Sequence, residues 1–384
     1  SWNFLNGSND PTNTDTDGDH GTSVAGLIAM AKNNVGGIGV APAVTLKGFN
    51  FLKNQATSDQ ISSLGGSSIN PKSDDVFVFN LSYGLRNTSD TSINSSVLSQ
   101  YISGVTSLRS GKGALYVKSS GNGFFSYGSA FCSSAVAAGL TCQNANFDPS
   151  NAIPYQILVG AINASGIKSS YSTSGSAIWV SAPGGESGWN ASVTPGVDTD
   201  YYRPAMITTD QSDCTIGYSK ASGGNSAFNN ASSDNTDCNY ANTFNGTSSA
   251  APVTSGVIAL ILQANPLLTW RDVKHILAST SRKIDNSLSA VNVTLSNGTY
   301  IGEPAWITNA AGFDFHNWYG FGMIDAEAAI TVAQNSYTLL VPFSDTGTIS
   351  SGIINLAIPD NSVTGASNTI TVSGGPTIVE AVQI

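Results

Sequence analysis

Charged residues are scarce in this chain. They make up 10% of the sequence, well under the roughly 25% of an average soluble domain, and Ser, Thr, Asn and 40 Gly take their place. The 15 Lys and Arg are outnumbered by 25 Asp and Glu, which gives a formal net charge of −10. A nucleic-acid partner would require a basic face opposite its phosphates. The composition therefore excludes that class of function.

Long apolar runs are also missing. No stretch approaches the roughly 18–20 residues that span a bilayer, so the sequence predicts no membrane span. The first residues, Ser1-Trp2-Asn3-Phe4, show neither a Met nor the basic-then-apolar pattern of a secretory signal. We therefore expect the chain to begin inside a longer gene product. Its 40% of hydrophobic residues suffice for a large core.

Only four cysteines occur, Cys132, Cys142, Cys214 and Cys238. They are too dispersed for a zinc site and lack CxxC spacing. Their proximity in sequence suggests the disulfides Cys132–Cys142 and Cys214–Cys238, which would indicate an oxidising compartment. Four buried free thiols are the alternative.

Short apolar segments alternate with helical patterns over most of the chain. Near-continuous apolar strands separated by helices are typical of a parallel sheet covered on both faces, the α/β class. The expected strands are residues 44–52, 76–81, 114–118, 156–162, 177–180 and 205–208, and the expected helices are 21–32, 94–109, 249–264, 270–279 and 326–334. In such sheets, functional residues gather where strands end and helices begin.

Two polar loops, 184–204 and 211–242, interrupt this pattern. Loops of this length are typical of binding segments or lids. The helical pattern stops near residue 336, and β-type segments punctuated by Gly, Asp and Ser follow at 339–343, 353–358 and 368–372. We expect one domain over residues 1–336 and the beginning of an all-β second domain over 337–384.

Three short motifs lie at expected strand or helix ends. They are DHGTSVAG (residues 19–26), SSGNG (119–123) and NGTSSAAP (245–252). Taken singly, each has an ordinary explanation as a helix cap or a loop. Together they supply an imidazole base in His20, a side-chain amide in Asn122 and a hydroxyl nucleophile in Ser248.

These three groups suit acyl transfer. A Ser hydroxyl is a weak nucleophile until an imidazole accepts its proton. Ser248 lies at an expected helix N-terminus, where unpaired backbone N–H groups can hold an oxyanion, and the Asn122 amide could be the second donor. Pro252 is expected in the first turn of that helix.

The motifs resemble, in the same order, the His, oxyanion-Asn and Ser motifs of the subtilisin-like serine proteases. The kexin/furin-like branch is indicated by ANP and TWRDV (residues 264–273) and by WITNAAGFDFHNWYGFGMIDA (306–326). The resemblance covers essentially the whole chain. It implies a subtilisin-like peptidase domain followed by the first part of a β-rich P domain.

By the same resemblance, the protein is expected to be a secreted serine endopeptidase that forms an acyl-enzyme on a peptide or protein substrate. A propeptide or a chaperone is a possible further partner. The alternative is a catalytically silent subtilase fold that serves as a binding or scaffold module. The presence of Ser248, His20 and Asn122 together argues against that alternative.

The third member of the family's triad, an aspartate, precedes the His in sequence. Only nineteen residues precede His20, and their acidic residues are Asp10, Asp15, Asp17 and Asp19. These lie in a polar loop with no buried strand before it, so we interpret them as loop residues. The catalytic Asp is expected upstream of Ser1. The alternative is a native protein that lacks it.

Two segments resemble the family's substrate-binding elements. Asp148 matches the acidic residue at the base of the first specificity pocket, and a buried carboxylate demands a cation, so Arg or Lys is expected at P1. A turn aspartate before Pro149 is the alternative. Ser82-Tyr83-Gly84 resembles the segment that pairs with the substrate backbone as an added strand.

Beyond P1 the resemblance weakens. Strict dibasic proteases carry an acidic cluster after this segment, whereas Leu85-Arg86-Asn87 follows here and Asp90 is the first acid. Arg86 would repel a second basic side chain. We expect a broader enzyme that reads P2 loosely.

Calcium is the expected cofactor. Residues 33–40 resemble the family's calcium loop, in which the Asn33 side chain and the carbonyls of Val35 and Gly37 would be oxygen ligands. A carboxylate from upstream would complete the site. A simple turn is the alternative. A second family calcium uses a Glu where Thr173 stands, and we do not expect it.

The remaining polar candidates have structural explanations. His275, within an expected helix, and His316, between aromatic residues, are expected to be packed side chains rather than ligands. Asp325 is expected to cap the helix at 326–334.

Overall fold

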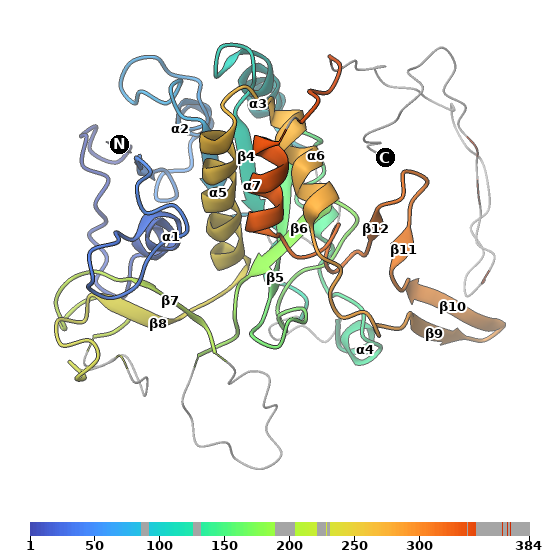
Figure 1. Ribbon diagram of the computed structural model, residues 1–384. Helices are drawn as coiled ribbons and strands as arrows, with labels where there is room; N and C mark the ends of the chain where they lie inside the picture. Colours follow the sequence, from blue (N-terminus) through green and yellow to red (C-terminus); the bar gives the residue numbers. More distant parts are fainter. Residues whose placement is uncertain are drawn as a thin grey trace.

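A four-stranded parallel sheet forms the centre of the computed structural model (Figure 1). The structure describes residues 1–85, 92–125, 132–188, 204–220, 228, 231–335, 337–342, 363, 367 and 369. The strand order is β3-β4-β5-β6, with bounds Val78–Leu81, Leu115–Ser119, Gln156–Ile162 and Ile178–Pro183. All residues of β4 and β5 are buried, as expected for a sheet covered on both faces.

Helices cover both faces of this sheet. On one face, Tyr116 of β4 stacks on Phe79 and contacts Tyr101 of α3 (Ser95–Ser107), with ring centroids 5.0 and 4.9 Å away. Asn80, the next residue along β3, accepts a 2.9 Å hydrogen bond from Ser255 of α5 (Thr247–Ala264). Because consecutive strand residues point to opposite faces, α3 and α5 lie on opposite faces. The expected α/β architecture is confirmed.

The central helix is α5, which packs against all four strands. It lies beside α7 (Ala326–Gln334), which contacts α6 (Trp270–Thr280), so the three helices form one layer (Figure 1). By length and hydropathy α5 could cross a membrane, but 67% of it is buried inside the fold, as in the core helix of a water-soluble domain. Asp325 caps α7 by accepting the Ala328 N–H at 3.0 Å, as expected.

Smaller elements surround this core. The short helices are α1 (His20–Ala29), α2 (Thr57–Ser63), α4 (Ser133–Ala137) and the 3₁₀ turn η2 (Ala145–Phe147). β1 (Trp2–Asn3) and β2 (Phe49–Asn50) pair in parallel. The antiparallel pairs are β7 (Met206–Thr209) with β8 (Tyr240–Phe244), β9 (Val291–Leu295) with β10 (Gly298–Glu303), and β11 (Ile307–Thr308) with β12 (Asp314–Phe315).

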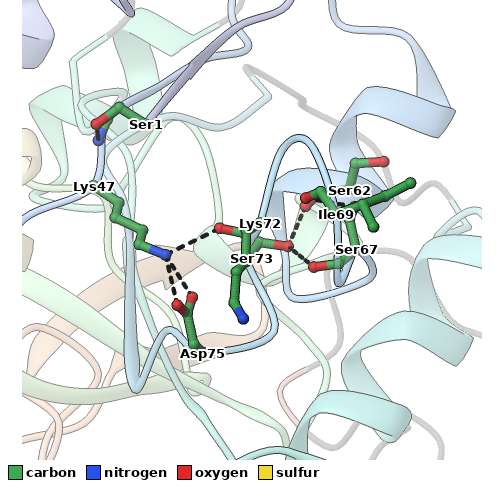
Figure 2. A network of polar contacts seen from close by, with 9 residues as sticks. Ser1, Lys47, Ser62, Ser67, Ile69, Lys72, Ser73 and Asp75 are labelled. Carbon is green, nitrogen blue, oxygen red and sulfur yellow. Dashed lines mark hydrogen bonds and ion pairs between the residues drawn. The ribbon is translucent and has the colours of Figure 1, made fainter. Parts of the chain in front are cut away.

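The prediction of a strand at 44–52 is wrong. Only β2 is extended there, because its partner β1 is two residues long and offers no further ladder. Polar contacts fix the chain before β2 instead (Figure 2). The Lys47 ammonium lies 2.6 Å from Asp75 Oδ1, and the Gly48 N–H donates to Ser1 Oγ at 3.1 Å. Side-chain contacts therefore hold the N-terminal segment where backbone pairing stops.

The strand expected at 205–208 forms, as β7, but it does not join the central sheet. It pairs with β8, which lies at the end of the region expected to be loop. Helix α1 packs against β7. Thr208 Oγ1 donates to the Ser23 carbonyl at 2.6 Å. A Cβ at Gly26 would lie 2.2 Å from Thr209 Oγ1, so only glycine permits this close packing. An apolar strand pattern predicts extended backbone but does not identify its partner.

Both suggested disulfides are confirmed: Cys132 pairs with Cys142, and Cys214 pairs with Cys238. Most of 337–384 and of the loop 184–204 lies outside the described residues, as do Arg86, Asn87 and Asp90. The short described stretch 337–342 lies on α6, where the Leu340 N–H donates to Asp272 Oδ1 at 2.8 Å. The P domain and the domain boundary at 336 stay predictions.

Candidate active site

Ser248 is the second residue of α5, after the N-cap Gly246 and the first helical residue Thr247. Gly246 has φ +95°, a left-handed conformation that favours glycine. Its N–H donates to the Tyr171 hydroxyl at 2.8 Å, which fixes the turn into the helix. The backbone N–H of Ser248 belongs to the first helical turn and has no carbonyl partner within the helix. It is therefore available to a developing oxyanion.

Ser248 is held by Ser82, which directly follows β3. Pro252 lies in the second turn of α5, not in the first as expected, and it lacks the N–H that would reach the Ser248 carbonyl. Ser82 Oγ fills that place by donating to the Ser248 carbonyl at 2.9 Å. In return, Ser248 Oγ donates to the Ser82 carbonyl at 3.4 Å.

The Asn122 amide is oriented by Thr247. Asn122 Oδ1 accepts hydrogen bonds from the backbone N–H and from Oγ1 of Thr247, both at 2.9 Å. Because the oxygen end is held, the Nδ2 end is the donor that remains for an oxyanion. A Cβ at Gly246 would lie 2.9 Å from Nδ2, so glycine leaves this amide accessible. Sequence reasoning missed Thr247, although the residue stands next to Ser248 in the motif.

His20 is the first residue of α1. The N-cap Asp19 accepts the Gly21 N–H at 2.9 Å, and the rings of His20 and Phe244 pack in a T-shaped arrangement, with centroids 5.3 Å apart. Burial lowers the pKa of His20 below its ordinary value, and the charge of Asp19 partly raises it again. Within the described residues, no hydrogen bond joins His20 to Ser248, whose hydroxyl donates to Ser82.

None of the four aspartates before His20 orients the imidazole. Asp19 is the helix cap, Asp15 pairs with Lys53, and Asp17 pairs with Lys220. Asp10 accepts the Thr12 N–H at 3.0 Å. These contacts agree with the interpretation of the four residues as loop and cap residues, and the triad aspartate upstream of Ser1 stays a prediction.

Asp148 follows η2 and is 5% exposed. Its Oδ2 lies 2.9 Å from the ammonium of Lys118, which is itself 2% exposed. Burial alone would raise the pKa of Asp148, but the charge of Lys118 and the hydrogen bonds from Ser150 and Leu85 lower it below the ordinary value. Burial lowers the pKa of Lys118, and Asp148 opposes that shift. The expected buried carboxylate is present, but its cation comes from the chain itself.

Asp148 lines a small cavity beside the loop that carries Asn122. The cavity is lined by Ser120 and Gly121, which precede Asn122, and by Asn144, Asp148 and Thr173. Thr173 Oγ1 accepts the Gly123 N–H at 2.7 Å and so supports the same loop.

The segment Ser82-Tyr83-Gly84 runs between this cavity and the nucleophile. Tyr83 packs against Phe51, with ring centroids 5.7 Å apart, and burial raises its pKa. Leu85, the next residue, lines the cavity. The location suits a substrate backbone, and the pairing itself stays a prediction.

The candidate calcium loop does not provide a complete shell of ligands. Asn33 Oδ1 accepts the Val35 N–H at 3.1 Å, and the Val35 carbonyl accepts the Tyr240 hydroxyl at 3.4 Å. The Gly37 carbonyl is the third candidate oxygen. Among the described residues, no group of three or more His, Cys, Asp or Glu could hold a metal ion. Calcium prefers six to eight oxygens that include carboxylates, so these three residues alone do not fit it.

The other two histidines are packed side chains, as expected. His316 is 1% exposed, and its Nδ1 accepts the Trp318 N–H at 3.0 Å. Burial lowers the pKa of His316 to about 4. His275 Nδ1 lies 2.9 Å from the Tyr337 hydroxyl.

Several known proteins are similar to this chain in sequence. An extracellular serine protease of Aeromonas sobria is 37% identical over 412 residues, covering 100% of this chain and 61% of that protein. Kexin of Saccharomyces cerevisiae is 30% identical over 344 residues, covering 87% of this chain and 32% of kexin. The chain therefore spans less than two thirds of the length of these relatives.

Solved structures of related proteases are also similar to this chain. Two crystal structures of the Aeromonas sobria serine protease, one of them in complex with the chaperone ORF2, match with TM-scores of 0.78 at 37% and 36% identity. Each match covers 89% of this chain and 57% of the solved chain. The sequence model of the subtilase family matches residues 1–322. Because this model covers most of the chain, the chain belongs to the subtilase family.

Proposed function

We propose that this chain carries the catalytic residues of a secreted serine endopeptidase that cleaves peptide bonds through an acyl-enzyme. The observation that carries the proposal is the arrangement at the start of α5, where Thr247 orients the Asn122 amide and Ser248 stands in the first turn. Two oxyanion donors and a nucleophile from separate parts of the chain meet there. A purely structural helix start has no need of this arrangement.

The mechanism follows from these groups. Ser248 Oγ attacks the substrate carbonyl while His20 accepts its proton, and the carbonyl oxygen becomes an oxyanion held by the Ser248 N–H and Asn122 Nδ2. His20 then gives the proton to the leaving amine, and the acyl-enzyme remains. Water attacks the ester in the second half, with His20 again removing the proton, and the acid product leaves Ser248.

This mechanism requires the Ser248 hydroxyl to turn from the Ser82 carbonyl toward His20. It also requires a group that fixes the tautomer of His20, a role that an aspartate has in such triads. We place that aspartate in the full-length gene product, outside this chain.

Secretion and a protein partner are part of the proposal. The two disulfides are typical of an oxidising compartment, and the similar Aeromonas sobria protease is described as extracellular. That protease has been solved with a chaperone, which supports a propeptide or chaperone partner for this chain. Calcium stays a prediction that depends on ligands beyond Asn33, Val35 and Gly37.

The prediction of a basic P1 residue needs a correction to its premise. It assumed that Asp148 is a buried carboxylate whose cation must come from the substrate. Lys118 already supplies that cation at 2.9 Å. The cavity at Asp148 stays the proposed P1 pocket, and Arg or Lys at P1 stays a prediction that rests on the similarity to kexin rather than on the charge of Asp148 alone.

A fluorophosphonate probe tests the proposed function. The full-length protein should be labelled on Ser248, and Ser248→Ala should abolish labelling. Ser249→Ala is the matched control, because Ser249 is the adjacent, fully buried hydroxyl of the same helix and should leave labelling unchanged. A folded protein that is not labelled would instead be a silent subtilase fold.

A further inference from the structure

Thr173 contacts the loop that carries Asn122 on both sides of that residue. Its backbone N–H donates to the Gly121 carbonyl at 3.0 Å, and its Oγ1 accepts the Gly123 N–H at 2.7 Å. The Thr173 carbonyl also accepts a hydrogen bond from Ser120 Oγ at 3.1 Å. The Gly121 carbonyl and the Gly123 N–H belong to the two peptide groups that flank Asn122. Thr173 therefore fixes both of these peptide groups.

Glycine stands on each side of Asn122, at positions 121 and 123. Glycine restricts the backbone less than any other residue, so this stretch needs contacts from elsewhere to give the Asn122 amide one direction. The glycines also let Thr173 approach. Gly121 has φ +112°, and a Cβ there would lie 3.0 Å from Thr173 Oγ1. The sequence Gly-Asn-Gly thus permits the contact with Thr173 and makes the position of Asn122 depend on it.

Thr173 is a firm support because it is buried. It is 2% exposed, so its bonds to the loop are shielded from water. A buried N–H that loses its acceptor is costly, and this cost keeps the Gly123 N–H on Thr173 Oγ1. On the other edge of the loop, the Gln143 N–H donates to the Gly123 carbonyl at 3.0 Å, and the Cys142 N–H donates to the Phe124 carbonyl at 2.9 Å. The loop is therefore held between two other segments of the chain.

The segment that contains Thr173 also contacts the turn before Ser248. The Tyr171 carbonyl accepts the Phe124 N–H at 3.1 Å, and the Tyr171 hydroxyl accepts the Gly246 N–H at 2.8 Å. Gly246 is the N-cap of α5, whose first turn contains the Ser248 N–H. Both proposed oxyanion donors must reach the same oxygen, at about 2.7–3.1 Å. One short segment thus sets the positions of both donors.

Ser172 lies within the same segment but serves a different part of the fold. Its Oγ accepts the Ala161 N–H of β5 at 2.9 Å. Ser172 and Thr173 are both buried, and the hydroxyl oxygen of each accepts one backbone N–H. The Ser172 hydroxyl faces the sheet, whereas the Thr173 hydroxyl faces the loop. Ser172 is therefore a matched control for the loss of a buried hydroxyl at this place.

We propose that Thr173 is a positioning residue for the oxyanion hole: it fixes the two peptide groups of Asn122 so that Nδ2 points to the oxyanion as it forms. The inference rests on the proposed function and adds a residue to its machinery. The oxyanion exists in the transition state and in the tetrahedral intermediate, not in the bound substrate. Loss of the positioning should therefore lower kcat and leave KM nearly unchanged.

Thr173→Val tests the proposal in the full-length protein. Valine keeps the shape and the backbone N–H and removes the hydroxyl that holds Gly123. Complete loss of an oxyanion donor costs about 10²–10³ in kcat, so partial misplacement should lower kcat about tenfold, with KM within about twofold. Thr173→Ser returns the hydroxyl and should restore kcat, and Ser172→Ala should lower kcat less than about twofold. A wild-type kcat in folded Thr173→Val, or an equal loss in Ser172→Ala, would overturn the proposal.

A pair of inhibitors separates positioning from a general loss of structure. In a peptide aldehyde with Arg at P1, Ser248 Oγ adds to the carbonyl carbon, its proton passes to His20, and the carbonyl oxygen enters the oxyanion hole. The matched peptide alcohol binds without forming this bond. Thr173→Val should weaken inhibition by the aldehyde about tenfold and leave binding of the alcohol unchanged. Equal weakening of both would show that Thr173 acts on substrate binding or on the fold, and the proposal would fail.

The Asn122→Ala background gives a further control. No amide remains there to be positioned, so adding Thr173→Val should lower kcat by less than about twofold. A further tenfold loss would contradict a role through Asn122. Fluorophosphonate labelling of the wild-type protein separates this inference from the proposed function. If Ser248 is labelled and Thr173→Val keeps the wild-type kcat, only the positioning role fails; if wild-type Ser248 is not labelled, the proposed function fails and the positioning role fails with it.

Discussion

Ser82 and Ser248 exchange two hydrogen bonds. Ser82 Oγ donates to the Ser248 carbonyl at 2.9 Å, and Ser248 Oγ donates to the Ser82 carbonyl at 3.4 Å. The first bond satisfies a helix carbonyl that Pro252 leaves without its usual N–H. The second holds the nucleophile in a resting orientation, from which it must rotate to reach His20. One residue at the end of β3 thus stabilises the backbone of the nucleophile and sets its starting position.

Ser82→Ala should destabilise the protein through this carbonyl. A buried acceptor left without a donor costs about 1–2 kcal/mol, and urea unfolding should show a loss of that size. In a Pro252→Ala background the helix regains an N–H toward Ser248, so the same Ser82→Ala change should cost less than about 0.5 kcal/mol. A double-mutant cycle with no coupling between the two positions would contradict this explanation of the proline.

Thr247→Val should slow turnover by loosening Asn122. The variant removes the hydroxyl that donates to Asn122 Oδ1 at 2.9 Å and keeps the backbone bond. Complete loss of an oxyanion donor costs about 10²–10³ in kcat, so partial loss of its orientation should cost about tenfold, with KM nearly unchanged. Thr247→Ser retains the hydroxyl and should restore kcat. An effect on KM alone would show that Thr247 acts on substrate binding instead.

Asp19→Asn should move the acid limb of the pH profile of kcat/KM to lower pH. Burial lowers the pKa of His20, and the negative charge of Asp19 opposes that shift. Asparagine remains a good N-cap, so α1 should keep its stability while the pKa of His20 falls further. Because the base must be neutral to accept the Ser248 proton, kcat/KM should persist to lower pH in the variant. An acid limb that moves to higher pH would contradict this assignment.

Much of the site could be predicted because its signals are local. His20, Asn122 and Ser248 each lie in a short motif at a strand or helix end, and the structure places each of them at such an end. Thr247 could not be assigned, because an oxygen that orients a distant amide has the same sequence pattern as an ordinary cap. Only the fold brings residues 122 and 247 together.

Lys118 was missed although a signal existed. It lies in a strand that was expected to be buried, and a fully buried lysine almost always has an ionic partner. That rule would have directed attention to a carboxylate such as Asp148 before the structure was known. The β9–β10 hairpin likewise has a signal in its turn residues Ser296 and Asn297, which Gly298 follows at the start of β10. By contrast, the prediction of a strand at 44–52 was wrong because the sequence of a segment does not show whether a partner strand is present.

Two buried groups near the end of the peptidase domain should give the stability curve opposing slopes. Burial lowers the pKa of His316 to about 4, and burial raises the pKa of Glu303, which is 7% exposed, to about 7. The neutral His316 stabilises the fold fully above its ordinary pKa near 6.5, and this contribution is lost as the pH falls toward 4. The neutral Glu303 stabilises the fold below about pH 4.5, and this contribution is lost as the pH rises toward 7.

Each shift corresponds to about 3 kcal/mol, so in the wild-type protein the two contributions should nearly cancel between pH 4 and 7. Glu303→Gln should leave the His316 slope uncompensated, and the free energy of unfolding should then rise with pH by about 3 kcal/mol relative to wild type. In His316→Gln, the free energy of unfolding should instead fall with rising pH by a similar amount relative to wild type. Urea unfolding of the three proteins at intervals across this range measures only the differences in slope, so a uniform loss of stability from either substitution does not matter. Parallel curves for all three would show that neither group is held neutral by the fold.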